Sequence, residues 1–331
     1  MLSGKRQFFS LLIVLSLVVS CSVTALSAQK DFFRNRAGER LVALAQRIDT
    51  STEIEKFREL LAYRPDPDLQ DSSGATPLWL ASAAGRRDVV QLLIDHKADP
   101  DIPTLDGATP LWISTIGGHI GVIRVLMEAD ADVNRAAGNG TTPLWLASWN
   151  GIEEFVRMYL AAGADPNARE KKNKSTPLWC AAVNGHEGII KLLLDHGAEV
   201  NIVSGDGATP LCMAASGGHI ETVRLLLEND AEAGFTTEEG TTPLWIAAAE
   251  GHDEVVTELM DAGADPNVKD YKFGASSVWM AARNGHAEVV RVLIRAGVSL
   301  DGEAKGFSVR GIAEEQGHLE IVLLLTIDLD D

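Results

Sequence analysis

Thr76-Pro77-Leu78-Trp79 is the stretch that decides the fold, because it returns along the chain at nearly constant intervals. Further copies, intact or altered, begin at Thr109, Thr142, Thr176, Thr209, Thr242, Ser276 and Ser308. The steps between the eight copies are 33, 33, 34, 33, 33, 34 and 32 residues. Self-similarity at such a period is typical of a solenoid, in which each repeat is one supersecondary unit and neighbouring units share a core. The sequence therefore predicts a stack of eight units.

Each copy has the pattern of two short helices joined by a turn. Thr is a favourable N-cap residue, and Pro suits the first helical position because its missing N–H is not needed there. In the copy that starts at Thr242, Gly251 is expected to end the first helix and His252 to open the second. The second helix carries an apolar stripe, as in residues 289–294, and a glycine such as Gly297 ends it.

These features resemble the ankyrin repeat, a helix–turn–helix unit with a protruding turn and a period of about 33 residues. The resemblance covers residues 72–331 and implies an all-α fold, a solenoid of stacked helix–turn–helix units with protruding turns or hairpins. It also implies that the chain binds another protein. The family motif is Thr-Pro-Leu-His, whereas Trp takes the His place in six copies here. The hydrogen bonds that the family's His makes within its repeat are therefore absent or replaced.

Both ends of the predicted solenoid differ from its middle. Residues 29–71 are expected to form an N-terminal helical cap, with two amphipathic helices within residues 39–64 that lack the repeat motif. The last repeat carries Glu314 where the internal copies have Ala, Ser or Thr. This is the pattern of a polar C-terminal cap, which a solenoid needs where its end faces water.

Residues 1–28 are typical of a signal peptide. Two basic residues precede an apolar run over residues 8–19, which is shorter than the about 20 residues of a transmembrane helix. Val18-Val19-Ser20-Cys21 resembles the lipobox of bacterial lipoprotein precursors, which implies cleavage before Cys21 and acylation of that residue. The alternative is ordinary cleavage after Ala25 or Ala28. Both predict an exported protein, either lipid-anchored in the cell envelope or periplasm, or secreted.

Charge and cysteine content exclude several classes of protein. There are 47 acidic and 29 basic residues, so the net charge is −18 and nucleic acid would be repelled. Three cysteines are too few for a disulfide scaffold. We expect Cys180 and Cys212 to be buried free thiols, with a disulfide between them as the less favoured alternative. The protein is expected to be a monomer.

No catalytic, cofactor or metal site is expected. The sequence has no Gly-x-Ser-x-Gly, His-Glu-x-x-His, phosphate-loop or dinucleotide-binding motif, and the repeats and caps leave no room for a catalytic domain. Six of the eight histidines recur after glycine at one position of the repeat. Equivalent positions on packed helices lie about 8–10 Å apart, which is too far for one zinc ion to join them. These histidines are therefore expected to be structural.

Surface residues that differ between copies are the candidates for binding a partner. The six motif tryptophans are expected to pack between a first helix and the rest of the same repeat, but Trp149 lies outside this series. The partner-binding hypothesis comprises residues at the end of one first helix and on three turn tips: Trp149, Asn150, Arg169, Lys171, Lys172, Lys174, Phe235, Tyr271, Lys272 and Phe273. The aromatic residues would supply contact area and the bases orientation. The alternative is that these are only tolerant loops.

Two functions remain open. One is an exported interaction module that binds a protein through its turn tips and concave first-helix face. The other is an envelope-associated structural or protective protein that binds a peptide or small ligand along the tryptophan-bearing face. Asn139 and Asn173 lie in glycosylation sequons, which would be used only in a eukaryotic secretory pathway.

Overall fold

The computed structural model describes residues 36–45, 51–301 and 303–327. The predicted signal peptide and Cys21 lie outside these residues. The chain divides into two compact units, residues 1–132 (unit 1) and residues 133–331 (unit 2), which are treated separately below. Among the helices of the described part, none is both long and apolar enough to cross a membrane.

Unit 1 contains a helix over residues 36–45, then α2 (Ser51–Leu61) and two complete repeats. The helices of the two repeats are α3 (Pro77–Ala83), α4 (Arg87–Asp95), α5 (Pro110–Ile116) and α6 (Ile120–Glu128). Leu41 and Phe57 of the two leading helices are fully buried. Because α2 packs against α4, these helices extend the core of the first repeat toward the N-terminus.

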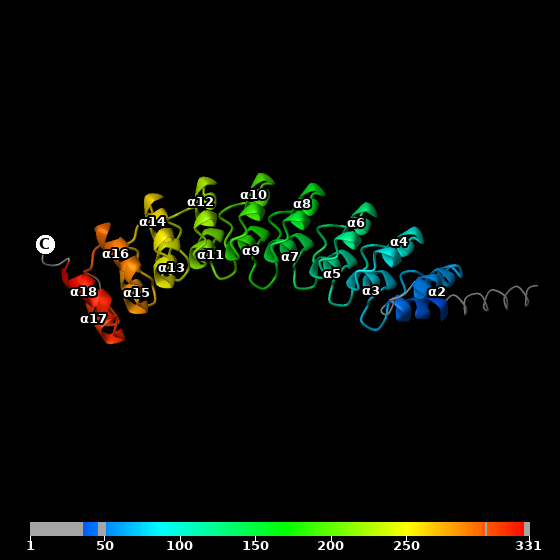
Figure 1. Ribbon diagram of the computed structural model, residues 1–331, viewed down its shortest axis with the longest axis horizontal. Helices are drawn as coiled ribbons and strands as arrows, with labels where there is room; N and C mark the ends of the chain where they lie inside the picture. The colour runs from blue at the N-terminus through cyan, green and yellow to red at the C-terminus, as the bar shows by residue number, and fades with distance from the viewer. Residues whose placement is uncertain (1–35, 46–50, 302, 328–331) are drawn as a thin grey trace, which may run out of the picture. The chain divides into compact units, whose positions relative to one another are not determined.

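Unit 2 contains six repeats, each with a first (inner) and a second (outer) helix (Figure 1). The inner helices are α7 (Pro143–Trp149), α9 (Pro177–Val183), α11 (Pro210–Ser216), α13 (Pro243–Glu250), α15 (Ser277–Asn284) and α17 (Val309–Gln316). The outer helices are α8 (Glu153–Ala161), α10 (Glu187–Asp195), α12 (Ile220–Glu228), α14 (Asp253–Asp261), α16 (Ala287–Arg295) and α18 (Leu319–Ile327). The last turn carries an antiparallel hairpin of β1 (Glu303–Ala304) and β2 (Phe307–Ser308).

The repeat motif starts each inner helix as its chemistry predicts. The hydroxyl of Thr142 accepts a hydrogen bond from the backbone N–H of Trp145 at 3.1 Å, and Pro143 occupies the first helical position. The other threonine copies make the same bond, whereas Ser276 makes no side-chain cap bond. The N-cap therefore depends on the local motif in each repeat, which is why the helix starts were predictable.

The core lies between successive repeats as well as within them. The motif leucines, such as Leu144 and Leu178, are fully buried. Alanines such as Ala147 and Ala181 are also fully buried, and their small side chains let neighbouring inner helices pack closely. The predicted free thiols are confirmed, because Cys180 and Cys212 are buried and unpaired. Burial raises the pKa of both thiols.

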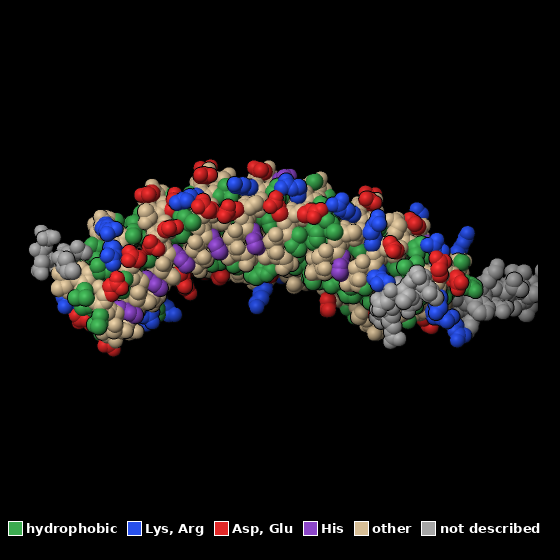
Figure 2. Space-filling model, in the orientation of Figure 1, with side chains coloured by type: hydrophobic (Ala, Val, Ile, Leu, Met, Phe, Trp, Pro, Cys, Tyr) green, Lys and Arg blue, Asp and Glu red, His purple; other side chains and the backbone are tan. Residues whose placement is uncertain are grey.

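Within unit 2, a glycine and a histidine from adjacent repeats form each junction. Gly251 follows α13 with φ +91° and ψ 23°, in the left-handed region, which confirms that it ends this helix. The His286 ring of the next repeat lies against Gly251, and its Nε2 lies 3.0 Å from the carbonyl oxygen of Ala249. Figure 2 shows histidine side chains in a row along this face of unit 2. Their role is to join repeats.

The C-terminal end of unit 2 is only partly polar. Glu314 of α17 is exposed, as expected of a capping helix. The next helix, α18, exposes Leu319 and Leu323, whose side chains are 72% and 63% exposed. The polar surface predicted for the last repeat therefore covers α17 and only part of α18, where Glu320 is exposed.

Candidate functional site

Three of the six motif tryptophans link their repeat to the following one. The indole N–H of Trp145 donates to Ser175 Oγ at 3.2 Å, and that of Trp245 donates to the carbonyl oxygen of Ala275 at 2.9 Å. Trp279 makes the same kind of bond to the carbonyl oxygen of Phe307 at 3.0 Å. The prediction that these side chains pack only within their own repeat is wrong for these three. They reach the turn of the next repeat, which gives the Trp-for-His replacement a structural role.

Trp149 lies at the end of α7 and forms a parallel stack with Trp145. Their ring centroids are 5.6 Å apart and their planes differ by 3°. Trp149 is still 41% exposed, so one aromatic surface remains open to a ligand. Residues four apart share a helix face, so this spacing could have revealed the stack from the sequence. Asn150, the C-cap residue, is exposed beside Trp149.

The position of Trp149 varies from one inner helix to the next. Its counterparts in the other repeats that carry an intact or single-substituted motif are Ala83, Ile116, Val183, Ser216 and Ala249. In contrast, the alanine two positions earlier, Ala147, recurs in most copies and is fully buried. The position of Trp149 is thus free of the packing constraint that fixes its neighbours.

The turn between the third and fourth repeats, residues 169–174, is the basic tip. Its four bases, Arg169, Lys171, Lys172 and Lys174, are exposed as predicted. Glu170 is only 8% exposed and points inward, where its carboxylate accepts hydrogen bonds from the backbone N–H groups of Lys172, at 2.7 Å, and Asn173. The single acid of this turn therefore organises its backbone, and the surface of the tip presents cations.

Hydrogen bonds to backbone carbonyl oxygens hold the basic tip to both neighbouring turns. The backbone N–H of Lys171 donates to Asn139 at 2.9 Å, and Lys171 Nζ donates to the carbonyl oxygen of Gly138 at 2.9 Å. On the other side, the Arg169 guanidinium donates to the carbonyl oxygen of Val203. These bonds fix the position of the tip. Trp145 bonds to Ser175, immediately after the tip, and so connects the tip to the Trp145–Trp149 stack.

The aromatic residues of the later tips differ in exposure. Tyr271 is 75% exposed, as predicted, and Lys272 beside it is also exposed. Phe235 and Phe273 are half-buried, so less of each ring is available as contact area than their place on the tips predicted. Lys305 Nζ lies 3.8 Å from the centroid of the Phe273 ring, a cation–π contact with the next turn. Phe273 therefore joins two turns.

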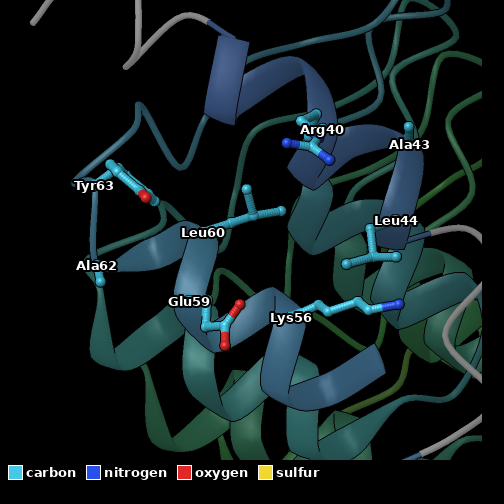
Figure 3. Close-up of a pocket in the computed structure, with 8 residues that line it drawn as sticks. All are labelled: Arg40, Ala43, Leu44, Lys56, Glu59, Leu60, Ala62 and Tyr63. Atoms are coloured by element: carbon cyan, nitrogen blue, oxygen red, sulfur yellow. The ribbon is translucent and has the colours of Figure 1, made fainter. Parts of the chain in front are cut away.

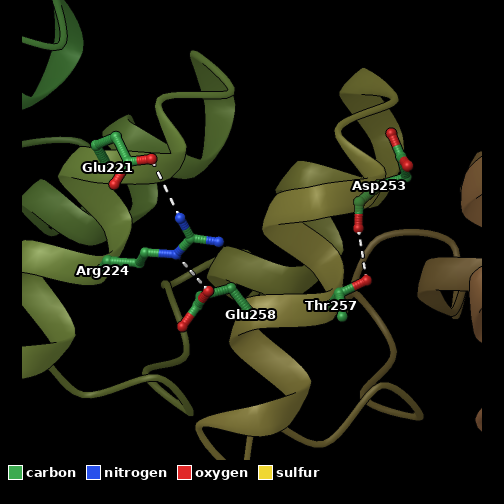
Figure 4. Close-up of polar contacts among 5 residues, drawn as sticks. All are labelled: Glu221, Arg224, Asp253, Thr257 and Glu258. Carbon is green, nitrogen blue, oxygen red and sulfur yellow. Dashed lines mark hydrogen bonds and ion pairs between the residues drawn. The ribbon is translucent and has the colours of Figure 1, made fainter.

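The outer helices of unit 2 carry ion pairs between repeats (Figure 4). Arg224 of α12 pairs with Glu221 on the same helix at 3.1 Å and with Glu258 on α14 at 2.7 Å. The hydrogen bond to Glu258 raises the pKa of Arg224. Thr257 Oγ1 donates to the carbonyl oxygen of Asp253 at 2.9 Å. Exposed pairs of this kind contribute little to stability individually, so the outer face is a solvated surface that assists repeat pairing.

A separate cavity of about 810 Å³ lies in unit 1 between the two leading helices (Figure 3). Leu44, Leu60 and Tyr63 provide its apolar surface, and Arg40 and Lys56 its positive charge. No candidate residue from the sequence lies there. Within residues 36–45, 51–301 and 303–327, no group of three or more His, Cys, Asp or Glu side chains is placed to hold a metal ion.

Comparison with known families agrees with this architecture. A family model of three ankyrin repeats matches residues 44–137, 132–204 and 201–270, and a single-repeat model matches residues 273–303. The first match begins at residue 44, within the segment that the sequence assigned to the cap. No curated protein matches the chain. Ankyrin repeats generally act as protein–protein interaction modules, and proteins built from them are typically non-enzymatic scaffolds. With these matches extending over most of its length, the chain belongs to the ankyrin repeat family.

Proposed function

We propose that this protein is an exported, non-enzymatic scaffold that binds a partner protein through the inner-helix face and turn tips of unit 2. The exposed Trp149 surface supports this most directly. A large aromatic side chain stands at a position where other repeats carry the smaller residues Ala, Ser, Val or Ile, so packing does not require it. Trp is enriched among the residues that dominate binding energy at interfaces.

The tip residues extend this surface. Lys171, Lys172 and Lys174 on one tip, and Tyr271 on a later one, are exposed on the same unit. Exposed aromatic side chains provide contact area, whereas charges at the rim steer association and fix orientation. Phe235 and Phe273 take a smaller part, because their rings are half-buried.

The proposal of export rests on the signal-peptide pattern of residues 1–28, in which Cys21 is the proposed lipid attachment site. An acylated Cys21 would hold the protein at the cell envelope, where its repeats would present the binding face. Mass spectrometry of the mature N-terminus tests this directly. A lipidated N-terminal Cys21, and loss of processing in Cys21→Ala, are expected. An unlipidated N-terminus near Gln29 would leave secretion alone, and a product that keeps Met1 would refute export.

Capture of the partner from the native compartment tests the binding face. Trp149→Ala should weaken binding by about fivefold or more, since a hot spot contributes about 1 kcal/mol or above. The stability of the Trp149→Ala variant should hardly change, because Ala83 and Ala249 occupy the equivalent position in other repeats. Ile116→Ala is the matched control, as Ile116 is 49% exposed at the equivalent position in unit 1. Equal losses in both variants, or none in Trp149→Ala, would contradict this binding face. Retention of only a small molecule would favour the envelope-protein alternative.

A further inference from the structure

Two adjacent turns of unit 2 together carry five exposed cations. The basic tip exposes four cations, and Arg135 is exposed on the turn that precedes it. Glu170 is turned inward onto backbone N–H groups, so it does not form part of the exposed surface. A cationic surface of this density stands out on a chain of net charge −18.

Two of the three lysines on this surface are free to meet an external anion. Among the described residues, neither Lys172 nor Lys174 forms an ion pair. The adjoining inner helices α7, α9 and α11 contain no charged residue, so they would not repel an incoming carboxylate. Acids of this region lie on outer helices, such as Glu153 and Glu187, and Asp206 is exposed on the turn that follows the basic tip.

The length of α7 sets the scale for a short extended peptide between the basic tip and Trp149. Trp145 bonds to Ser175 beside the tip, and Trp149 stacks on Trp145 further along α7. A helix rises about 1.5 Å per residue, so the six steps from Pro143 to Trp149 span about 9 Å. An extended chain covers about 3.3 Å per residue, so about three residues bridge this length.

We propose that the third and fourth repeats bind an extended acidic peptide segment of the partner protein. A proline or aromatic ring of the segment lies flat on Trp149. Carboxylates about three to five residues away pair with Lys172 and Lys174. This inference rests on the proposed protein-binding function and specifies the chemistry of the partner at that surface.

Selection from a random library of twelve-residue peptides displayed on phage, against the immobilised full chain, tests the proposal. Enriched peptides should carry several Asp or Glu residues and one ring-bearing residue at the stated spacing. A fluorescein-labelled copy of the best peptide should lose at least about tenfold in affinity with Lys172→Glu, and tighten as salt is lowered. The matched control is Lys191→Glu, an equal charge change on the outer helix α10, which should change affinity less than about twofold.

The outcomes separate this inference from the broader function. Selection of neutral or basic peptides whose binding is lost in Trp149→Ala would support protein binding on this face. It would overturn the proposal that the bound segment is acidic. An acidic peptide that binds Lys172→Glu as well as the parent would also overturn it. Equal competition by a single-stranded oligonucleotide of the same charge would show a general polyanion site and overturn the peptide specificity. Failure to enrich any peptide would count against the inference, while capture of a folded partner would still support the function.

Discussion

Replacing Gly251 by alanine should weaken the junction between two repeats of unit 2. Gly251 has φ +91°, and Gly263, after the next helix, has a similar φ of +88°. Placing an L side chain in the left-handed region costs about 1–2 kcal/mol at either site. The two substitutions therefore share the same backbone strain, and any difference between them reports what the new methyl group contacts.

The methyl groups meet different surroundings. A Cβ at Gly251 would lie 2.5 Å from Nδ1 of His286, whereas a Cβ at Gly263 would have nothing within 4 Å. The His286 ring would have to move and lose its hydrogen bond to Ala249, which contributes about 0.5–1.5 kcal/mol. Since the ring can rotate, the steric cost lies at the lower end of the about 1–3 kcal/mol for overpacking. We expect the free energy of unfolding to fall by about 2.5–4.5 kcal/mol in Gly251→Ala and by about 1–2 kcal/mol in Gly263→Ala.

Urea unfolding measures how much the free energy of unfolding falls. Hydrogen exchange shows which residues lose protection. Each repeat contacts only its neighbours, so Gly251→Ala should reduce protection first in residues 242–327. His286→Ala in the Gly251→Ala background removes the clash, so the two changes together should cost less than their separate effects. Equal losses for Gly251→Ala and Gly263→Ala, with additive effects in the double variant, would refute the proposed contact. Uniform loss of protection along unit 2 would refute the local character of the damage.

Three further predictions concern single side chains. Burial raises the pKa of Asp68, and repulsion from Asp66 and Asp99 adds to this shift, although a hydrogen bond from the backbone N–H of Asp99 opposes it. Ionisation of Asp68 therefore destabilises the fold as pH rises above 3.8, the ordinary pKa of the group. Asp68→Asn should raise the free energy of unfolding in urea at pH 7, and this gain should vanish well below pH 3.8. Trp245→Phe should cost about 1 kcal/mol through its lost indole hydrogen bond, whereas Trp179→Phe, whose buried indole N–H has no partner among the described residues, should cost less in the same urea assay. Cys180 and Cys212 should react with a thiol reagent at pH 8 only at the rate of unfolding, because burial keeps them inaccessible and raises their pKa; rapid labelling of the native protein would show that the repeats open locally.

The sequence by itself determined the repeat architecture and the ends of most inner helices. Thr142 caps its helix through a hydrogen bond to a residue three positions ahead, and Gly251 ends another by its own backbone conformation. Such interactions are local, so spacing and residue type are enough to predict them. The exposure of Trp149 and of the basic tip was predictable for a similar reason, because both occupy positions that vary among otherwise similar copies.

Only the tertiary structure decided how the repeats contact one another. Trp145 reaches Ser175, Lys305 covers Phe273, and His286 lies on Gly251, contacts that join residues about 30 or more positions apart. Their partners depend on the rotation and translation from one repeat to the next, which the packing of whole helices sets. Glu170 is the other case: its sequence position beside four bases does not show whether its carboxylate faces solvent or the backbone. The three-dimensional path of the turn brings N–H groups to that carboxylate, and this leaves the cations alone on the surface.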